Sequence, residues 1–136
     1  MKGQQFRAQL GAWAQQTQAN LDALVRQSTQ ELAARVVQAT PVDTGFLRGS
    51  WQPSIGEPKV AQGTFDKAGA IAMGMVGVAA AGMKAGDYFY MLNNASYAEH
   101  VEYGTSKMAG RHFVGNTVLA WAQIVDETAA DLGLKK

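Results

Sequence analysis

The sequence predicts an α+β fold: a long N-terminal helix, a small and mostly antiparallel sheet of three or four strands, a middle helix and a C-terminal helix, with the helices packed on one sheet face. Three observations lead to this prediction. Apolar residues recur every three or four positions over residues 4–38 and again over residues 111–132, and residues 87–93 form an aromatic and apolar run of strand composition. With 136 residues, 47% of them hydrophobic, residues 1–136 are expected to form a single domain around one core.

The first helix has the clearest periodicity. Its apolar stripe starts with Phe6, Leu10 and Trp13 and continues to Val36, while polar and charged residues occupy the other faces. At 1.5 Å per residue the helix would be roughly 50 Å long, about twice the diameter of a compact domain of this size. Residues 1–38 are therefore expected to form a helix that extends beyond the core.

Two interpretations of this extension stay open. In the first, about ten N-terminal residues fray or form a separate short helix. In the second, Phe6, Leu10 and Trp13 pack on a neighbouring subunit, because an exposed tryptophan is unfavourable in water.

A turn is predicted after the first helix. Pro41 disfavours helical geometry at the residue before it and so ends the helix. Asp43 can accept backbone N–H groups from the next two residues in an Asx turn, and Gly45 can adopt a positive φ without steric cost.

Core and partner assignments follow for the residues after this turn. Leu47 and Trp51 are expected to enter the core. Arg48 is a candidate partner for a carboxylate, either Glu99 or Glu102.

Two strands and a middle helix are predicted next. Residues 49–55 are expected at a sheet edge, because Pro53 cannot donate a ladder hydrogen bond, and residues 87–93 in a central strand. Between them, alanines in residues 65–83 favour a helix, although four glycines oppose it at roughly 1 kcal/mol each. Asp66 can cap the start of this helix, and Gly82 or Gly86 can end it.

The apolar residues Ile71, Met75, Val78 and Met83 of the middle helix are expected near one face, and its many small residues would let another backbone come close. A strand over residues 71–76 is the alternative, which the weak alternation does not favour.

The C-terminal part is predicted to contain one short element, a loop and one helix. Residues 97–103 form a strand or a helical turn that directs Glu99, His100 and Glu102 toward solvent or a loop. A polar loop over residues 105–110 then leads to a helix over residues 111–132, in which Trp121 is expected in the core.

Two segments, TPVDTGFLRGSW at residues 40–51 and NNASYAEHVEYGTS at residues 93–106, together carry a family resemblance. Their composition and order resemble the small neck, head-tail joining and tail-completion proteins of long-tailed bacteriophages and prophages. The residues that match the family's structural motif are Pro41, Asp43, Gly45, Leu47, Arg48, Trp51, Tyr97, Glu102 and Gly104.

The resemblance implies a non-enzymatic structural subunit that forms or joins an oligomeric ring at the head-tail junction. Its partners would be further copies of itself and the portal, connector or tail-tube proteins. The protein would be made in the bacterial host cytoplasm and end in the virion. The candidate subunit-interface residues are Phe6, Leu10, Trp13, Thr105, Lys107, Arg111 and His112.

Composition argues against several other functions. A net charge of +1, without a basic run, does not favour specific nucleic-acid binding, and no cysteine is available as a nucleophile or metal ligand. No cofactor or metal is expected, since the two histidines lack a known ligand spacing and residues 104–107 have the wrong order for a phosphate loop. The uncharged residues 68–83 are too few to span a membrane.

Two alternatives remain open. The first is a small cytoplasmic regulatory or toxin/immunity-type module, which would share the α+β character. The second is a hydrolase that uses Glu102 or His100, although no Gly-x-Ser-x-Gly nucleophile motif is present.

Overall fold

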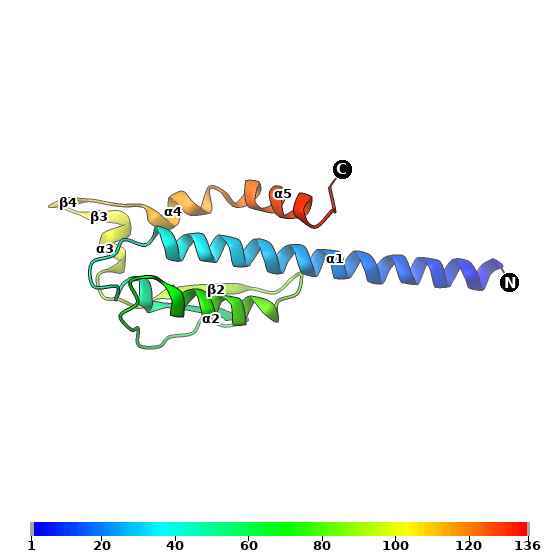
Figure 1. The fold of residues 1–136 in the computed structure, drawn as a ribbon, viewed down its shortest axis with the longest axis horizontal. Coiled ribbons are helices and arrows are strands. Elements are labelled where there is room, and N and C mark those ends of the chain that lie inside the picture. The colour runs from blue at the N-terminus through cyan, green and yellow to red at the C-terminus, as the bar shows by residue number, and fades with distance from the viewer. Residues whose placement is uncertain (1, 136) are drawn as a thin grey trace.

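The computed structural model describes residues 2–135 and is organised around one long helix (Figure 1). Helices α4 and α5 lie along one side of α1, and α2 with the β1–β2 sheet lies on the other (Figure 1). The α+β fold class is thereby confirmed. In chain order the elements are α1 (Lys2–Ala39), the short 3-10 helix η1 (Arg48–Ser50), β1 (Trp51–Ile55), α2 (Ala70–Ala81), β2 (Phe89–Asn93), α3 (Ala98–Tyr103), β3 (Gly104–Thr105), β4 (Met108–Ala109), α4 (Phe113–Val118) and α5 (Trp121–Asp131).

Helix α1 is continuous from Lys2 to Ala39, so its N-terminal residues do not form a separate helix. Only its C-terminal part enters the core, where Ala33, Val36 and Val37 are buried. Val37 is fully covered and lies in a cluster with Leu47, Trp51, Ala72, Ala95 and Phe113. As predicted, Leu47 and Trp51 belong to the core.

The β structure consists of two separate two-stranded antiparallel sheets within residues 2–135, rather than one sheet of three or four strands. Strand β1 pairs with β2 from Trp51 opposite Asn93 to Ile55 opposite Phe89. The prediction that residues 87–93 form a central strand is wrong, because β2 pairs only with β1 in the described part of the chain. The small β3–β4 ribbon forms a hairpin where a loop was expected.

Pro53 is tolerated in β1 because it occupies a position of the antiparallel ladder at which no N–H donor is needed. The Gly56 N–H donates to the Tyr88 carbonyl just beyond the paired residues. Hydrogen-bonded pairs alternate along an antiparallel ladder, so the nitrogen of Pro53 lies on the outer edge of β1, where no donor is needed.

The middle helix is confirmed as α2, over a shorter range than predicted. The Asp66 carboxylate accepts the N–H groups of Ile71 and Ala72 at 3.0 and 3.1 Å, and Gly82 stands at the C-terminal cap. Asp66 therefore caps the start of this helix, as predicted.

The inward face of α2 does not follow from its sequence. Ala72, Val76 and Ala80 are buried, whereas Ile71 and Val78 are exposed. In a helix whose residues are all apolar or glycine, periodicity does not identify the buried face. Val76 and Val78 are the same residue type, so the packing of α2 on α1 and β1, rather than side-chain size, determines which face is covered.

The C-terminal helical region is interrupted. Helix α4 ends at Val118 and α5 starts at Trp121, so the predicted single helix is two helices. The break changes the inward face: Ile124 and Thr128 are buried, and Trp121 is 40% exposed rather than in the core.

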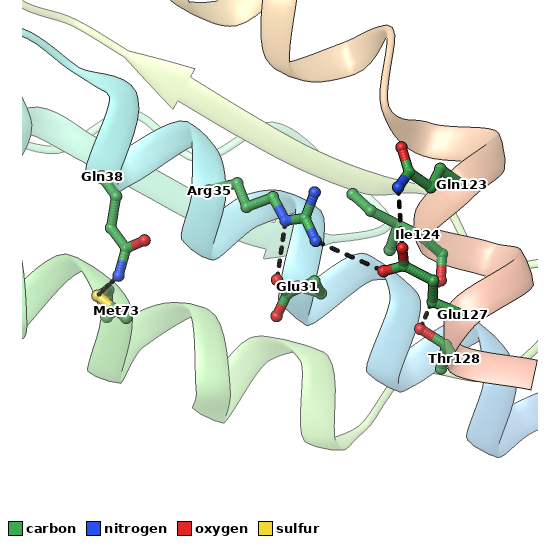
Figure 2. A network of polar contacts seen from close by, with 8 residues as sticks. All are labelled: Glu31, Arg35, Gln38, Met73, Gln123, Ile124, Glu127 and Thr128. Carbon is green, nitrogen blue, oxygen red and sulfur yellow. Dashed lines mark hydrogen bonds and ion pairs between the residues drawn. The ribbon is translucent and has the colours of Figure 1, made fainter. Parts of the chain in front are cut away.

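Polar contacts connect α1 with its neighbours on both sides (Figure 2). Arg35 pairs with Glu31 at 2.8 Å along α1 and reaches Glu127 of α5 at 3.9 Å. On the other side, the Gln38 amide lies 3.9 Å from the sulfur of Met73 in α2. The ion-paired side chains of Arg35, Glu31 and Glu127 are 38 to 53% exposed, so apolar packing, rather than the ion pairs, contributes most to holding the layers together.

Candidate assembly interface

The N-terminal part of α1 projects beyond the rest of the fold (Figure 1). Residues 2–16, here called the overhang, are all exposed. Within it Phe6, Leu10 and Trp13 expose 64%, 52% and 66% of their surface. These three residues occupy one face of the helix at spacings of four and three, so they form a continuous apolar stripe in solvent.

Between the overhang and the core, α1 makes two hydrogen bonds with the segment after α2. The Ala85 N–H donates to the Asp22 carboxylate at 2.9 Å, and Arg26 donates to the Met83 carbonyl at 3.2 Å. The hydrogen bond from Ala85, followed by that from Gln18, lowers the pKa of Asp22 against a smaller opposing effect of desolvation. At 1.5 Å per residue Trp13 lies roughly 13 Å beyond Asp22, and Phe6 roughly 24 Å beyond it.

Arg48 closes the C-terminal end of α1. Its guanidinium donates to the carbonyls of Gln38 and Thr40, both at 2.9 Å, and to the Lys67 carbonyl at 2.7 Å. The predicted pairing of Arg48 with Glu99 or Glu102 is therefore wrong. A cation that bonds the terminal carbonyls of a helix satisfies acceptors with no intrahelical partner and complements the helix dipole.

The Thr40 hydroxyl connects the same helix end to the core. It donates to the Val36 carbonyl at 2.7 Å and accepts the indole N–H of Trp51 at 2.8 Å. Both residues are buried, and the bond satisfies the only polar atom of the tryptophan side chain.

Gly45 fits the turn as predicted, with φ of +89°. A Cβ at this position would lie 2.5 Å from the Lys67 nitrogen, so the backbone there leaves no room for a side chain. Asp43 is exposed. Within residues 2–135 its carboxylate accepts no hydrogen bond from the N–H groups of Thr44 or Gly45, so the predicted Asx turn is wrong. The Thr44 hydroxyl instead accepts the Phe46 N–H at 3.3 Å.

Glu102 caps the start of α4. Its carboxylate accepts the N–H groups of Val114 and Gly115 at 3.0 and 2.9 Å, across eleven or more intervening residues. Glu102 is buried, contrary to the predicted solvent-facing orientation, because α3 is helical and turns this side chain toward α4. Tyr97, at the start of α3, is 40% exposed.

The β3–β4 hairpin forms the end of the molecule opposite the overhang (Figure 1). Gly104 starts it with φ of +90°, and the Gly110 nitrogen would lie 2.6 Å from a Cβ at this glycine. The predicted interface residues Thr105, Lys107, Arg111 and His112 are all exposed here. His112 precedes α4 with φ of 48°, in the left-handed region that a non-glycine residue seldom adopts.

The two sequence segments that carry the resemblance meet at one surface hollow of about 220 Å³. Asp43, from the first segment, and Arg111, which follows the second segment, both line this hollow and are both exposed. The residues around the hollow are Pro41, Val42, Asp43, Thr44, Gly45, Leu47, Tyr97, Val101 and Arg111. The fold therefore brings together the two motif segments, while the seven predicted interface residues remain in two groups at opposite ends.

A second hollow was missed by the sequence predictions. It measures about 520 Å³ and lies between α2 and β1, with Ile71, Met75 and Val78 on one side and Pro53 and Lys59 on the other. Val78 is 81% exposed and Ile71 is 52% exposed. The signal that could have revealed it is the absence of any polar side chain in residues 70–81, because a helix that is apolar on every face is normally buried on every face.

The two residues considered for a hydrolase, Glu102 and His100, lie in different environments. Glu102 is committed to two backbone amides, whereas Glu99 and His100 are exposed on α3. Over residues 2–135 there is no group of three or more His, Cys, Asp or Glu residues placed to hold a metal ion. None of the helices in that range combines the length and hydrophobicity needed to cross a membrane.

Comparison with protein families shows a match over most of the chain. The model of the HK97-gp10-like family, described as "Bacteriophage HK97-gp10, putative tail-component", matches residues 4–104. The matched region includes most of the overhang, Arg48, α2 and Glu102, and it ends at the start of the β3–β4 hairpin. No curated protein and no solved structure matches the chain significantly.

Proposed function

The chain belongs to the HK97-gp10-like family of bacteriophage tail components, and on this premise we propose that it is a non-enzymatic subunit of an oligomeric ring at the head-tail junction. Membership in the family makes it a structural phage protein that interacts with other phage structural proteins. The ring, and its position as a neck or tail-completion component, are the proposal.

The observation that carries the proposal is the overhang. Phe6, Leu10 and Trp13 expose about half to two thirds of their surface on a helix that projects from the fold. Soluble monomers seldom leave a contiguous stripe of this kind in water, and such stripes mark protein interaction sites. A contact made by one surface on a different surface of the next copy closes into a ring when the rotation per copy permits it.

The hairpin end suits a different partner. Thr105, Lys107, Arg111 and His112 present polar and basic groups at the end opposite the overhang. We assign this end to the connector or the tail tube, because the contacts that join one ring to another assembly are commonly made by loops at its rim. One copy would thus use its apolar end within the ring and its polar end between rings.

Counting the chain in intact tailed particles tests this function. Quantitative mass spectrometry should give a small fixed number of copies relative to the portal and major tail subunits, as expected for one ring per particle. Absence from particles would exclude the structural role and favour the regulatory or toxin/immunity alternative.

The role of the overhang is tested by Trp13→Ala. Since Trp13 is 66% exposed, the variant should unfold at the same urea concentration as the wild type while self-associating more weakly in analytical ultracentrifugation. A large loss of stability would instead mean that Trp13 contributes to folding. Self-association equal to that of the wild type would remove the overhang from the interface.

A further inference from the structure

We propose that the overhang of one copy docks its Phe6, Leu10 and Trp13 stripe into the hollow between α2 and β1 of the next copy. This inference rests on the proposed assembly of copies and adds to it the two surfaces that meet. The two surfaces cannot contact each other within one chain, because α1 is straight and carries the stripe away from its own α2 (Figure 1).

The receptor surface is apolar and concave. Helix α2 buries Ala72, Val76 and Ala80, whereas Ile71, Met75 and Val78 line the hollow of about 520 Å³. Cavities of about 300–1,000 Å³ hold ligands of drug size, so this one can accept an indole or phenyl ring. Gly74 and Ala79 also line it, and such small side chains allow the backbone of a second helix to come close.

The overhang is a convex counterpart with compatible charge. It contributes two aromatic rings and a leucine on one face, and its other residues are five glutamines, five alanines or glycines, and Lys2 and Arg7, which are its only charged side chains. Helix α2 has no charged residue, so docking buries no ion on that helix. Lys59, at the rim, carries the one charge along the hollow.

The available area fits a specific contact between copies. With aromatic side chains of about 150–250 Å², the exposures of Phe6, Leu10 and Trp13 correspond to roughly 350 Å² of apolar surface. Ile71, Val78 and the half-buried Met75 add roughly 250 Å² on the same scale. Because interfaces are only about 57% apolar, this corresponds to roughly 1,000 Å² in total, about the minimum for a specific interface. In a ring each copy makes this contact twice, once with each surface.

A smaller apolar hollow, on the side of α1 that faces α4, is less suitable. It measures about 200 Å³ and lies between α1, the β1–β2 sheet and α4, with Val118 at its edge. Of the nine residues that line it only Val118 is exposed, and Ala33, Val36 and Trp51 are only 3 to 6% exposed. It therefore offers little surface to a neighbour, and its exposed residue Val118 provides a matched control.

Disulfide trapping tests the pairing directly, because the chain has no cysteine. Three variants are compared after oxidation, both in purified tailed particles and as purified chain: Trp13→Cys with Val78→Cys, Trp13→Cys with Val118→Cys, and Trp13→Cys alone. A disulfide needs Cα atoms within about 7 Å, and Trp13 lies beyond the reach of its own α2, so a bond between positions 13 and 78 must join two copies.

We expect a covalent ladder on non-reducing gels for the 13/78 variant only. A ladder from the 13/118 variant would move the docking site to the other hollow. Dimers from Trp13→Cys alone would mean that overhangs pair with each other. Either result overturns the inference, as does the absence of any 13/78 cross-link in particles that contain the chain.

A charge substitution gives a second readout that does not depend on disulfide geometry. Val78→Glu should reduce incorporation into particles at least tenfold, while the matched Val118→Glu should not, and both should fold because both positions are exposed. Incorporation of folded Val78→Glu at the wild-type level would overturn the inference. The proposed function is tested by a different result: it is wrong if the wild-type chain is absent from particles.

Discussion

Replacing Arg48 with methionine tests how the end of α1 is held. Methionine retains an unbranched apolar stem and removes the guanidinium, so the carbonyls of Gln38, Thr40 and Lys67 lose their donor. These three carbonyls belong to the end of α1 and to the segment before α2. The variant therefore loosens the junction between the two helices without opening a cavity.

The expected loss follows from the number and exposure of these bonds. A hydrogen bond to a charged group contributes about 1.5–3 kcal/mol when shielded, which applies to the partly buried bond to Thr40. The two exposed bonds are weaker, and the charge at the helix end adds about 0.3–1 kcal/mol. Because these contributions overlap, we expect a decrease of about 2 to 3 kcal/mol in the free energy of unfolding. For a chain of this size, that corresponds to about 6 to 12 °C in Tm.

Urea unfolding, followed by far-UV circular dichroism and tryptophan fluorescence, measures this loss. The midpoints can be compared if the dependence of the unfolding free energy on urea concentration is the same for both proteins. Arg35→Met is the matched control. Arg35 is on the same helix, its ion pairs with Glu31 and Glu127 are exposed, and its loss should cost less than about 0.5 kcal/mol. If Arg48→Met costs no more than this control, the capping role is refuted. If the effects of Arg48→Met and Glu102→Gln on the free energy of unfolding differ from additivity by more than about 0.5 kcal/mol, an ion pair between Arg48 and Glu102 would explain the data better.

The remaining predictions concern the second motif, the turn and the base of the overhang. Glu102→Ala should destabilise the protein by about 2 kcal/mol in the same assay, because two amides at the start of α4 lose their acceptor, while exposed Glu99→Ala should be nearly neutral. Gly45→Ala should cost more than about 2 kcal/mol, since positive φ and a clash combine, whereas Gly86→Ala, with positive φ and open space, should cost about 1 kcal/mol. The folded-state pKa of Asp22 is lowered, so its contribution to stability is complete above its ordinary pKa of 3.8 and is lost as pH falls through the lower folded value. Asp22→Ala should therefore reduce the loss of stability in acid below about pH 4, as measured by urea midpoints; an unchanged pH profile would contradict this.

The sequence predicted those elements whose local signals agree with the final packing. The period of α1, Pro41 after its end, the positive φ of Gly45 and the Asp66 cap are all local, and all are present in the structure. Arg48 and Glu102 were assigned to the wrong partners because both bind backbone groups. A backbone carbonyl or amide looks the same at every position of a sequence, so only the fold can identify the partner.

The other errors have a similar cause. In α2 every face is apolar, so composition does not identify the buried face, and Val76 is buried while Val78 is exposed. The break between α4 and α5 at residues 119–120 contains neither glycine nor proline, so no local signal indicated that Trp121 would lie outside the core. The hollow beside α2 appears only when β1 and α2 are placed together.

The placement of these residues allows folding and assembly to be separated by mutation. Arg48 and Trp51 act at the C-terminal end of α1, and Trp13 lies roughly 40 Å away along the same helix. Residues this far apart, with no shared contacts, should have additive effects on stability. Variants at the helix end should therefore shift the unfolding midpoint and reduce assembly only in proportion to the unfolded fraction. Variants on the overhang or the outer face of α2 should leave the midpoint unchanged and reduce assembly directly. If Trp13→Ala and Arg48→Met impair assembly equally at a temperature where both are folded, then the end of α1 belongs to the interface as well.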